Sequence, residues 1–273
     1  MKTTDSTAPL LSIVTVCLES AATVAETLAS VDLALSGIAG DPVEHLIIDG
    51  LSKDKTLAIM EQHQAPYRRV VSETDTGLYN AMNKGLRLAH GQYIWFLNSD
   101  DLLDPSAAQW LPALLARLQS RQPRTLIGQI RMFREVAGER RLTRLWRLPG
   151  NVRNARRFGW HPPHPAFIAD RSFLTELGGF DESKRIAADF KLMIAAVDRA
   201  PSAVERFPHN LTLMREGGVS NANARSILRA NVECFRAQRE LGRSAMGAGV
   251  GVALKLSRKI LQTIDLSNRK AIT

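Results

Sequence analysis

The 273-residue chain has few cysteines and no long hydrophobic run. Its two cysteines, Cys17 and Cys234, lie far apart in the sequence, which excludes a small disulfide scaffold and favours a reducing compartment. No run approaches the roughly 18 apolar residues that a spanning helix needs, because the best candidate, residues 245–254, is short and contains glycines. With 45% hydrophobic residues, the chain can still bury a full core.

The start of the chain also lacks the features of a signal peptide. Residues 1–16 are polar before a short apolar run, without a basic start, a long apolar stretch or a small-residue cleavage site. We therefore expect a cytoplasmic protein.

The net charge of +9 is unevenly distributed along the chain. Residues 121–157 carry 11 basic and 2 acidic side chains, and residues 225–273 carry 10 and 3, whereas the rest of the chain is mildly acidic. We expect the acidic body to perform the chemistry and the two basic segments to meet something anionic. Nucleic acid is not the expected partner, because the basic segments contain few aromatic residues for stacking and no recognised binding motif.

The first half of the chain alternates strand-like and helix-like segments. Residues 10–17 form a continuous apolar run rich in β-branched residues, which is typical of a strand buried on both faces. The pattern predicts an α/β fold with a mixed, mostly parallel sheet and helices on both faces. Further strands are expected at residues 44–48, 67–72, 92–97 and 125–130, with helices at residues 21–35, 53–64, 77–90, 105–119 and from about 226 onward.

Acidic residues follow three of the expected strands. Asp49 ends the second strand, Asp75 lies in the loop after the third, and Asp100 and Asp101 follow the fourth. Ligands of open α/β sheets bind outside the carboxyl ends of the strands, so these carboxylates should converge on one crevice.

The adjacent carboxylates of Asp100 and Asp101 predict a metal site. They repel each other on a short turn, and a divalent cation relieves that repulsion while bridging the oxygens of a diphosphate. The alternative is a solvated turn followed by a helix cap, and Asp104 before Pro105 resembles such a cap.

The segment that begins at Asp49 predicts a contact with a nucleotide base. The Asp49 carboxylate can accept hydrogen bonds from a base edge, and Gly50 lets a ring approach the backbone closely. For Ser52 and Asp54 we favour the simpler interpretation that one of them caps the following helix.

A charged loop leads into the helix expected at residues 77–90. Asp75 is placed to reach a ribose or base, and Lys84 lies two turns into the helix, where it faces either phosphate or solvent. Gly77 and Gly85 weaken a helix, which indicates close backbone packing or a bound ligand.

Five segments, taken together in their order and spacing, carry a family resemblance. They are SIVTVCLES, HLIIDGLSKDKT, SETDTGLYNAMNKG, GQYIWFLNSDD and GGFDESKRIAADFKL. The series resembles glycosyltransferase family 2, the inverting enzymes of GT-A fold, and in particular the branch that builds bacterial capsule, exopolysaccharide and lipopolysaccharide chains. The match spans about residues 10–220.

The resemblance implies a role for each acidic residue. Asp49 and Asp75 would hold the nucleotide, Asp100 would contact ribose or sugar, and Asp101 would ligate Mn²⁺ or Mg²⁺. Asp189 would be the general base that takes the acceptor hydroxyl's proton while the metal stabilises the leaving diphosphate. The alternative for Asp189 is a helix cap.

The chain departs from the family pattern at four positions. Asn98 stands where relatives often have the first Asp of Asp-x-Asp-Asp, so metal binding would rest on fewer carboxylates. Glu19 replaces a common Asn, Asn80 a common Asp, and Ala188 a second acid beside the base. We expect these changes to affect donor preference more than the reaction.

Two histidines flank a Pro-Pro pair in the segment GWHPPHPAF. By family analogy, this loop lies near the acceptor, and we assign His164 to the nucleotide-sugar site. Isolated loop histidines are more often surface groups, which is the alternative for both His161 and His164.

In the tail, Lys255, Arg258 and Lys259 interleave with leucines and isoleucines. This pattern fits a basic amphipathic helix lying on an anionic membrane leaflet, and equally a surface helix that packs its apolar stripe on the domain. Membrane attachment, on the inner face of the cytoplasmic membrane, would suit an acceptor carried on a polyprenyl diphosphate.

We therefore predict three regions: a nucleotide-sugar-binding half at residues 1–120, an acceptor and catalytic-base half at residues 121–224, and a helical basic tail at residues 225–273. The predicted reaction is inverting transfer of a sugar from a nucleotide-sugar, favouring UDP, to a glycan or lipid-linked acceptor. One alternative is nucleotidyl transfer, although the Gly- and Arg-rich phosphate loop is absent. The other is a non-catalytic module that binds membrane or an anionic polymer, which Asn98 suggests.

Overall fold

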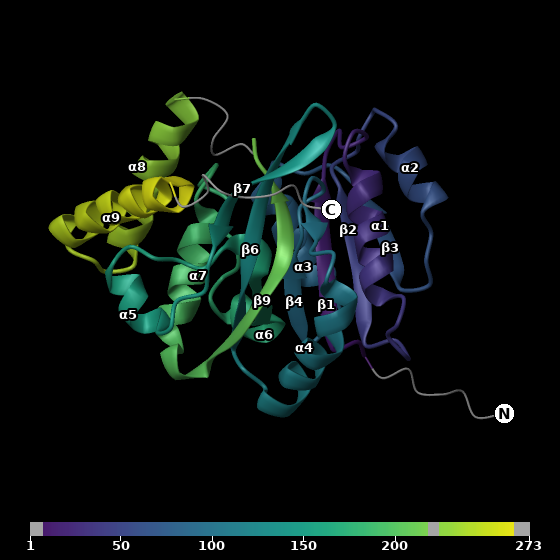
Figure 1. Cartoon of the computed structure of the whole chain (residues 1–273), viewed down its shortest axis with the longest axis horizontal. Coiled ribbons are helices and arrows are strands. Elements are labelled where there is room, and N and C mark those ends of the chain that lie inside the picture. Colours follow the sequence, from purple (N-terminus) through teal and green to yellow (C-terminus); the bar gives the residue numbers. More distant parts are fainter. Residues whose placement is uncertain (1–7, 218–223, 265–273) are drawn as a thin grey trace.

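The computed structural model describes residues 8–217 and 224–264 (Figure 1). Its centre is one twisted sheet with the strand order β3-β2-β1-β4-β8-β6-β9-β5, and β7 pairs with β6 outside this path. The strands are β1 (Leu11–Cys17), β2 (Val43–Asp49), β3 (Arg68–Ser72), β4 (Tyr93–Phe96), β5 (Leu102–Leu103), β6 (Thr125–Val136), β7 (Glu139–Trp146), β8 (Phe167–Asp170) and β9 (Val204–Arg215).

The helices follow the strands in the order that the sequence pattern predicts for the first half. They are α1 (Val24–Leu35), α2 (Thr56–Gln62), α3 (Leu78–Leu88), α4 (Ala107–Arg121), α5 (Val152–Arg157), α6 (Arg171–Glu176), α7 (Ala188–Arg199), α8 (Ala224–Glu240) and α9 (Ala245–Ile264), with short 3-10 turns η1 (His164–Ala166) and η2 (Pro201–Ala203). The expected α/β fold with a mixed sheet and a helical C-terminal part is confirmed.

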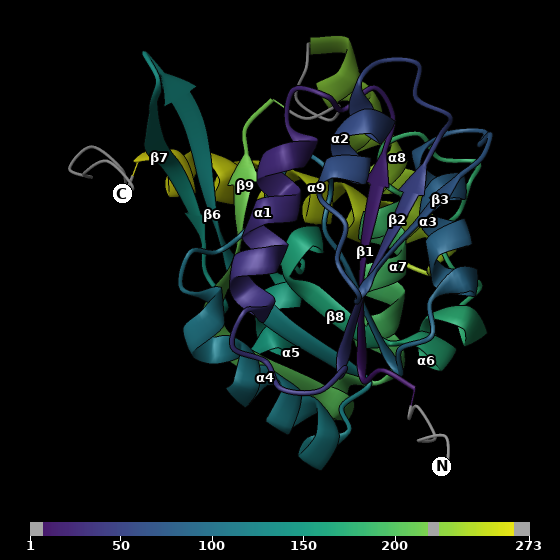
Figure 2. The same cartoon turned by 90° about the vertical axis from the view of Figure 1, so that its right-hand side faces the viewer.

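The four strands β3, β2, β1 and β4 pair in parallel and form the half of the sheet that the sequence predicts best. Every residue of β1 is buried, as expected for an apolar strand covered on both faces. Val14 and Val16 pack with α3, α6 and α7 on one face, whereas Leu11 and Ile13 pack with α1 and α4 on the other (Figure 2). The carboxyl ends of these strands therefore lie at one edge.

The second half of the sheet is mixed. β8 pairs antiparallel with both β4 and β6, β6 pairs in parallel with β9, and β7 forms a hairpin with β6. The strand expected at residues 125–130 runs on to Val136, and β7, β8 and β9 have no counterpart among the predicted strands. β7 is hard to find because its sequence, ERRLTRLW, is charged and only partly buried.

Two glycines, Gly85 and Gly91, pack so closely against β1 that neither position has room for a side chain. A Cβ on Gly85 would lie 2.5 Å from Val14 Cγ1, which confirms the predicted close packing of α3. A Cβ on Gly91 would lie 2.6 Å from the Ser12 backbone nitrogen. Helix α3 ends before Gly91, because Leu88 is its last residue and Ala89 its C-cap.

Many arginines of the basic segment 121–157 pair with acidic side chains, most of which belong to other segments. Arg131 lies 2.7 Å from Asp104, and Arg140 lies 2.8 Å from Glu26. Arg124, Arg134, Arg141 and Arg156 pair with Asp170, Glu216, Glu139 and Asp198 respectively. These internal partners account for much of the segment's charge, and the expected external anionic partner stays a prediction.

The C-terminal helices α8 and α9 pack on α7 through a small core of their own. This cluster contains Phe190 and Ile194 of α7 with Cys234 and Ala237 of α8. Among the described helices, none combines the length and the apolar character required to cross a bilayer. Residues 265–273 of the predicted tail lie outside the described residues, and the three-region division stays a prediction.

Candidate active site

Asp49, the last residue of β2, is fully buried at the carboxyl edge of the sheet. Its carboxylate accepts hydrogen bonds from Ser72 Oγ at 2.6 Å, Ser52 Oγ at 2.5 Å and the Ser52 N–H at 3.1 Å. Ser52 therefore holds the Asp49 carboxylate in place. Asp54 instead accepts the N–H of Thr56 at the start of α2, at 2.9 Å. The predicted contact between Asp49 and a base stays a prediction.

Asp75 lies directly against the loop that follows Asp49. A Cβ on Gly50 would lie 2.5 Å from Asp75 Oδ2. The space beside Gly50, which we expected a nucleotide base to occupy, is therefore taken by the Asp75 carboxylate. Asp75 Oδ1 accepts the N–H of Gly77 at 2.9 Å, and Gly77 has a φ of 133°, which favours glycine. The convergence expected for these two strand ends is confirmed.

Lys84 is not a solvated lysine. Its side chain is 12% exposed, and its ammonium lies 3.0 Å from Glu73 and donates to the Thr74 carbonyl. Lys84 thus ties α3 to the loop that carries Asp75. A contact with the nucleotide-sugar stays a prediction.

Asp100 and Asp101 form a buried acidic turn after β4. Asp101 Oδ1 accepts the backbone N–H of Arg215 at 3.0 Å, and Asn98 Nδ2 donates to Asp101 Oδ2 at 3.3 Å. Burial raises the pKa of both carboxyls, and the neighbouring charge of Asp100 raises the pKa of Asp101 further. A bound cation would favour the ionised forms that burial disfavours.

The residues of this turn fit a hard divalent cation. Asn98 Oδ1 is buried and has no hydrogen-bond partner, so a carbonyl oxygen stands unused beside the two carboxylates. Oxygen ligands of this kind suit Mg²⁺ and Mn²⁺. Within residues 8–217 and 224–264, no group of three or more His, Cys, Asp or Glu side chains could hold a metal ion. A cation here would take its remaining ligands from diphosphate and water.

Helix α1 positions the acidic turn through Thr27. Thr27 Oγ1 lies 2.9 Å from the carbonyl oxygens of both Ser99 and Asp101, and Ser20 Oγ lies 2.9 Å from Ser99 Oγ. The sequence gives no signal for Thr27 or for Arg215, because a mid-helix threonine and a strand arginine acquire these roles only through contacts across the fold.

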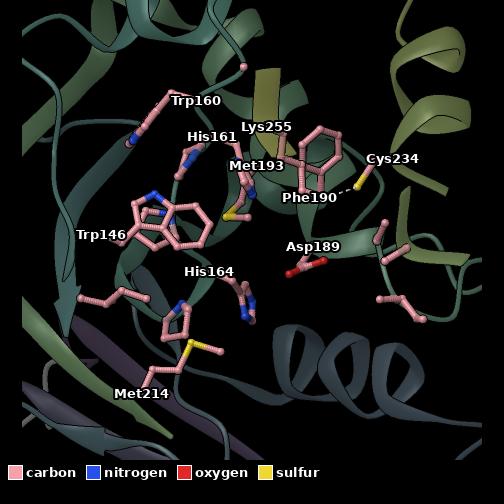
Figure 3. Close-up of a pocket in the computed structure, with 18 of the residues that line it drawn as sticks. Trp146, Trp160, His161, His164, Asp189, Phe190, Met193, Met214, Cys234 and Lys255 are labelled. Carbon is pink, nitrogen blue, oxygen red and sulfur yellow. Dashed lines mark hydrogen bonds between the residues drawn. The ribbon is translucent and has the colours of Figure 1, made fainter. Parts of the chain in front are cut away.

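Asp189 lies in the first turn of α7 and faces a cavity (Figure 3). It does not cap the helix, whose N-cap residue is Ala187 and which has no side-chain capping hydrogen bond. Glu233 of α8 accepts the N–H groups of Ile186 at 2.8 Å and Ala187 at 3.0 Å, just before the helix begins. Tyr79 of α3 donates its hydroxyl to Asp189 Oδ1 at 3.1 Å. Burial, and then the charge of Asp189, raises the pKa of Tyr79, so this donor stays protonated.

The cavity beside Asp189 has a volume of about 200 Å³ and mainly apolar walls. β6, β7, the loop at residues 159–165, α7, α8 and α9 all contribute to it. Its lining includes Ile130, Met132, Arg144, Trp146, Trp160, His161, His164, Asp189, Phe190, Met193, Met214, Ile227, Cys234, Lys255 and Leu256.

The two loop histidines are not surface groups, contrary to the alternative drawn from the sequence. His161 lies between Trp146 and Phe190, with ring centroids 4.7 and 5.1 Å apart. His164 stacks against Phe96 at 5.9 Å, and its buried Nε2 has no partner. Burial lowers the pKa of both imidazoles, which favours their neutral forms. The predicted contact of His164 with the nucleotide-sugar stays a prediction.

The cavity adjoins the acidic edge of the sheet at two places. Met214 lines the cavity, and the next residue of β9, Arg215, donates its N–H to Asp101. Phe96 is the last residue of β4, just before the acidic turn, and its ring stacks on His164 of the cavity lining. The fold, with an acidic sheet edge and a carboxylate facing a neighbouring cavity, is that of the GT-A glycosyltransferases.

The family model for glycosyl transferase family 2 matches residues 12–173, which is more than half of the chain. The chain therefore belongs to glycosyltransferase family 2. An uncharacterized glycosyltransferase of Mycobacterium tuberculosis is 29% identical over 154 residues, covering 56% of this chain and 57% of that protein. The PGL/p-HBAD biosynthesis glycosyltransferase of Mycobacterium bovis is 29% identical over 224 residues, covering 78% and 80%.

Solved structures share the fold at low sequence identity. The crystal structure of S. aureus TarS 1-349 in complex with UDP-GlcNAc is 18% identical, with a TM-score of 0.63, covering 93% of this chain and 74% of that one. The mannosyltransferase PcManGT from Pyrobaculum calidifontis, in complex with GDP-Man and Mn²⁺, is 16% identical, with a TM-score of 0.59, covering 94% and 76%.

Proposed function

We propose that the protein is an inverting glycosyltransferase that moves a sugar from a UDP-sugar to a hydroxyl of a glycan or lipid-linked acceptor. One observation carries the proposal: the Asp189 carboxylate, which Tyr79 holds and which does not cap α7, faces a cavity that adjoins the acidic edge. A general base needs this combination of a fixed carboxylate and open space for the substrate.

In the proposed reaction, Asp189 takes the proton of the acceptor hydroxyl while that oxygen attacks the anomeric carbon. The new glycosidic bond forms as the bond between the anomeric carbon and the diphosphate oxygen breaks, and the nucleoside diphosphate leaves with the electron pair. Attack from the side opposite the leaving group inverts the anomeric centre. The hydrogen bond from Tyr79 orients Asp189 for this step.

Asp100, Asp101 and Asn98 would hold a Mn²⁺ or Mg²⁺ ion, which when bound neutralises charge on the leaving diphosphate. Asp49 and Asp75 would hold the nucleotide, with Lys84 keeping the Asp75 loop in place. UDP is the favoured nucleotide because a TarS structure of the same fold contains UDP-GlcNAc.

We further propose peripheral contact with an anionic membrane through α9, on the cytoplasmic side. In the described part of this helix, Met246 is 80% exposed and Val250 is 52% exposed. Lys255 instead lines the cavity, so the basic stripe expected from the sequence does not include it. The side chains of Arg258 and Lys259 lie outside the described residues.

The activity is tested with UDP-GlcNAc and a panel of other nucleotide-sugars, by following nucleoside diphosphate release with Mn²⁺ and with a chelator. We expect release that needs the metal and is reduced in Asp101→Asn. Failure of every donor to bind or turn over would overturn the proposal. Vesicle co-sedimentation tests the membrane contact, which Val250→Glu should weaken and Lys53→Glu, at the sheet edge, should not.

A further inference from the structure

The cavity lining includes a lysine that forms no ion pair among the described residues. Lys255 of α9 places Nζ 3.1 Å from Cys234 Sγ and 5.5 Å from the centroid of Phe190 (Figure 3). Within the described part of the chain, no carboxylate forms an ion pair with it. By contrast, the nearby Lys184 and Lys191 each pair with carboxylates of Asp181 and Glu240.

An ammonium whose partners among the described residues are a thiol and an aromatic ring is incompletely compensated. Thiol sulfur is a weak hydrogen-bond acceptor, and desolvation of an ammonium is costly unless an anion accompanies it. The charge of Lys255 acts on the cavity, where it adds to the effect of burial in lowering the pKa of His161. The free ammonium therefore points to an anionic ligand.

The cavity also holds hydrogen-bond donors that have no partner. The indole N–H groups of Trp146 and Trp160, two residues of its lining, are buried and have no partner. Arg144 adds a second positive charge, with its guanidinium 4.5 Å from the centroid of Trp146. A ligand with several anionic oxygens would satisfy the two indole N–H groups, and the apolar walls would strengthen its attraction to Lys255.

We propose that Lys255 binds a phosphate or diphosphate group of the acceptor, beside the hydroxyl that Asp189 activates. This inference rests on the proposed function. The acceptor would carry its phosphate next to an apolar group that packs on Trp146, Phe190 and Leu256. A lipid-linked diphosphate and a water-soluble sugar phosphate share this chemistry, and the test separates them.

The four tryptophans of the chain make the cavity easy to observe. Trp146 and Trp160 line it, whereas Trp95 and Trp110 pack against each other in another part of the core, 6.3 Å apart. We would titrate the full chain with farnesyl diphosphate, glucose 1-phosphate and farnesol, and follow the four indole N–H signals by NMR. Binding in the cavity should move the signals of Trp146 and Trp160 and leave the other two in place.

Lys255→Gln should weaken binding of the phosphate probe about tenfold or more, because a hydrogen bond to a charged group is lost. Lys255→Arg should keep the affinity within a few fold, and Lys191→Gln, a lysine outside the cavity, should not change it. Loss of farnesyl diphosphate binding alone supports a lipid-linked acceptor, and loss of glucose 1-phosphate binding alone supports a soluble one. Equal affinities of wild type and Lys255→Gln, or farnesol binding as tightly as its diphosphate, would overturn the inference.

UDP-GlcNAc with Mn²⁺, titrated into the same variants, separates this inference from the proposed function. Lys255→Gln should bind the donor as wild type does. Donor binding with no effect of Lys255 on the phosphate probes rejects only the inference. Phosphate binding without any donor binding instead rejects the transferase while leaving an anion-binding cavity.

Discussion

The acidic edge of the sheet and the cavity beside Asp189 satisfy their polar groups in opposite ways. At the edge, Asp49 and Asp101 accept hydrogen bonds from the protein itself, chiefly from Ser52, Ser72 and Arg215. In the cavity, His164 Nε2 and the indole N–H of Trp146 are buried without partners. Apart from Asn98 Oδ1, the edge is thus preorganised by the fold, whereas the cavity leaves donors and acceptors for a ligand to complete.

The two regions also differ in which parts of the chain build them. The acidic residues of the edge come from the first 101 residues, whereas the cavity draws on segments from β6 to α9. A change at the edge should therefore disturb donor and metal binding, and a change in the cavity should disturb the acceptor step. The following substitutions test that separation, beginning with the largest expected effect.

Asp189→Asn should lower sugar transfer by about 10²–10⁴-fold, because an amide cannot accept the acceptor proton. Donor affinity should stay unchanged, since Asp189 belongs to the cavity and not to the edge. Steady-state transfer and calorimetric titration with UDP-GlcNAc measure the two quantities. Tyr79→Phe, which removes only the orienting hydrogen bond, should cost a few fold. Equal loss of donor binding and transfer in Asp189→Asn would break the separation.

Asp101→Asn should lower turnover by roughly 10²-fold, because the leaving diphosphate loses the metal's stabilisation. Affinity for Mn²⁺ should fall in parallel, as measured by electron paramagnetic resonance. Asn98→Asp is the opposite change, and we expect it to tighten Mn²⁺ binding by adding a carboxylate. Unchanged turnover and unchanged Mn²⁺ affinity in Asp101→Asn would contradict the metal assignment.

Gly159→Ala should destabilise the protein by about 2–4 kcal/mol. Gly159 has a φ of 77°, and its Cβ would lie 2.6 Å from Leu254 Cβ, so the substitution pushes α9 away from the cavity wall. Gly150→Ala is a matched control, because its Cβ would meet nothing within 4 Å. Urea unfolding measures both, and similar midpoints for the two variants would show that the cavity wall tolerates displacement of α9.

Acid should lower the stability of the protein through His45, which lies in β2 of the parallel half of the sheet. Burial, with a contribution from the charge of Arg68, lowers the pKa of His45 to about 3. Below its ordinary pKa of 6.5, the unfolded chain binds a proton that the folded chain refuses, so stability falls as the pH drops from about 6.5 toward 3. At pH 5 the loss is about 2 kcal/mol.

His45→Gln should reduce this pH dependence, although it costs stability at pH 7.5 by removing the hydrogen bond with Thr15, which spans 2.9 Å. Urea unfolding of wild type and variant at pH 7.5 and pH 5 gives the comparison. The same fall in stability for both proteins would show that His45 is not responsible.

Local sequence determined the parallel half of the sheet and the acidic residues at its edge. The apolar run of β1, the alternation of strands and helices, and Asp49, Asp75 and Asp101 after their strands are all visible as periodicity and spacing. The topology of parallel strands then requires those residues to meet, because their carboxyl ends share one edge.

Only the tertiary structure decided how the cavity is built. Glu233 of α8 accepts the N–H group of Ala187 just before α7, and Arg215 donates its backbone N–H to Asp101. Lys255 lines the cavity, although the sequence of its helix predicts a basic surface. Each depends on contacts between residues far apart in the chain, which periodicity cannot report. The acidic edge could therefore be predicted from the sequence, whereas the partners of Asp101 and the composition of the cavity could not.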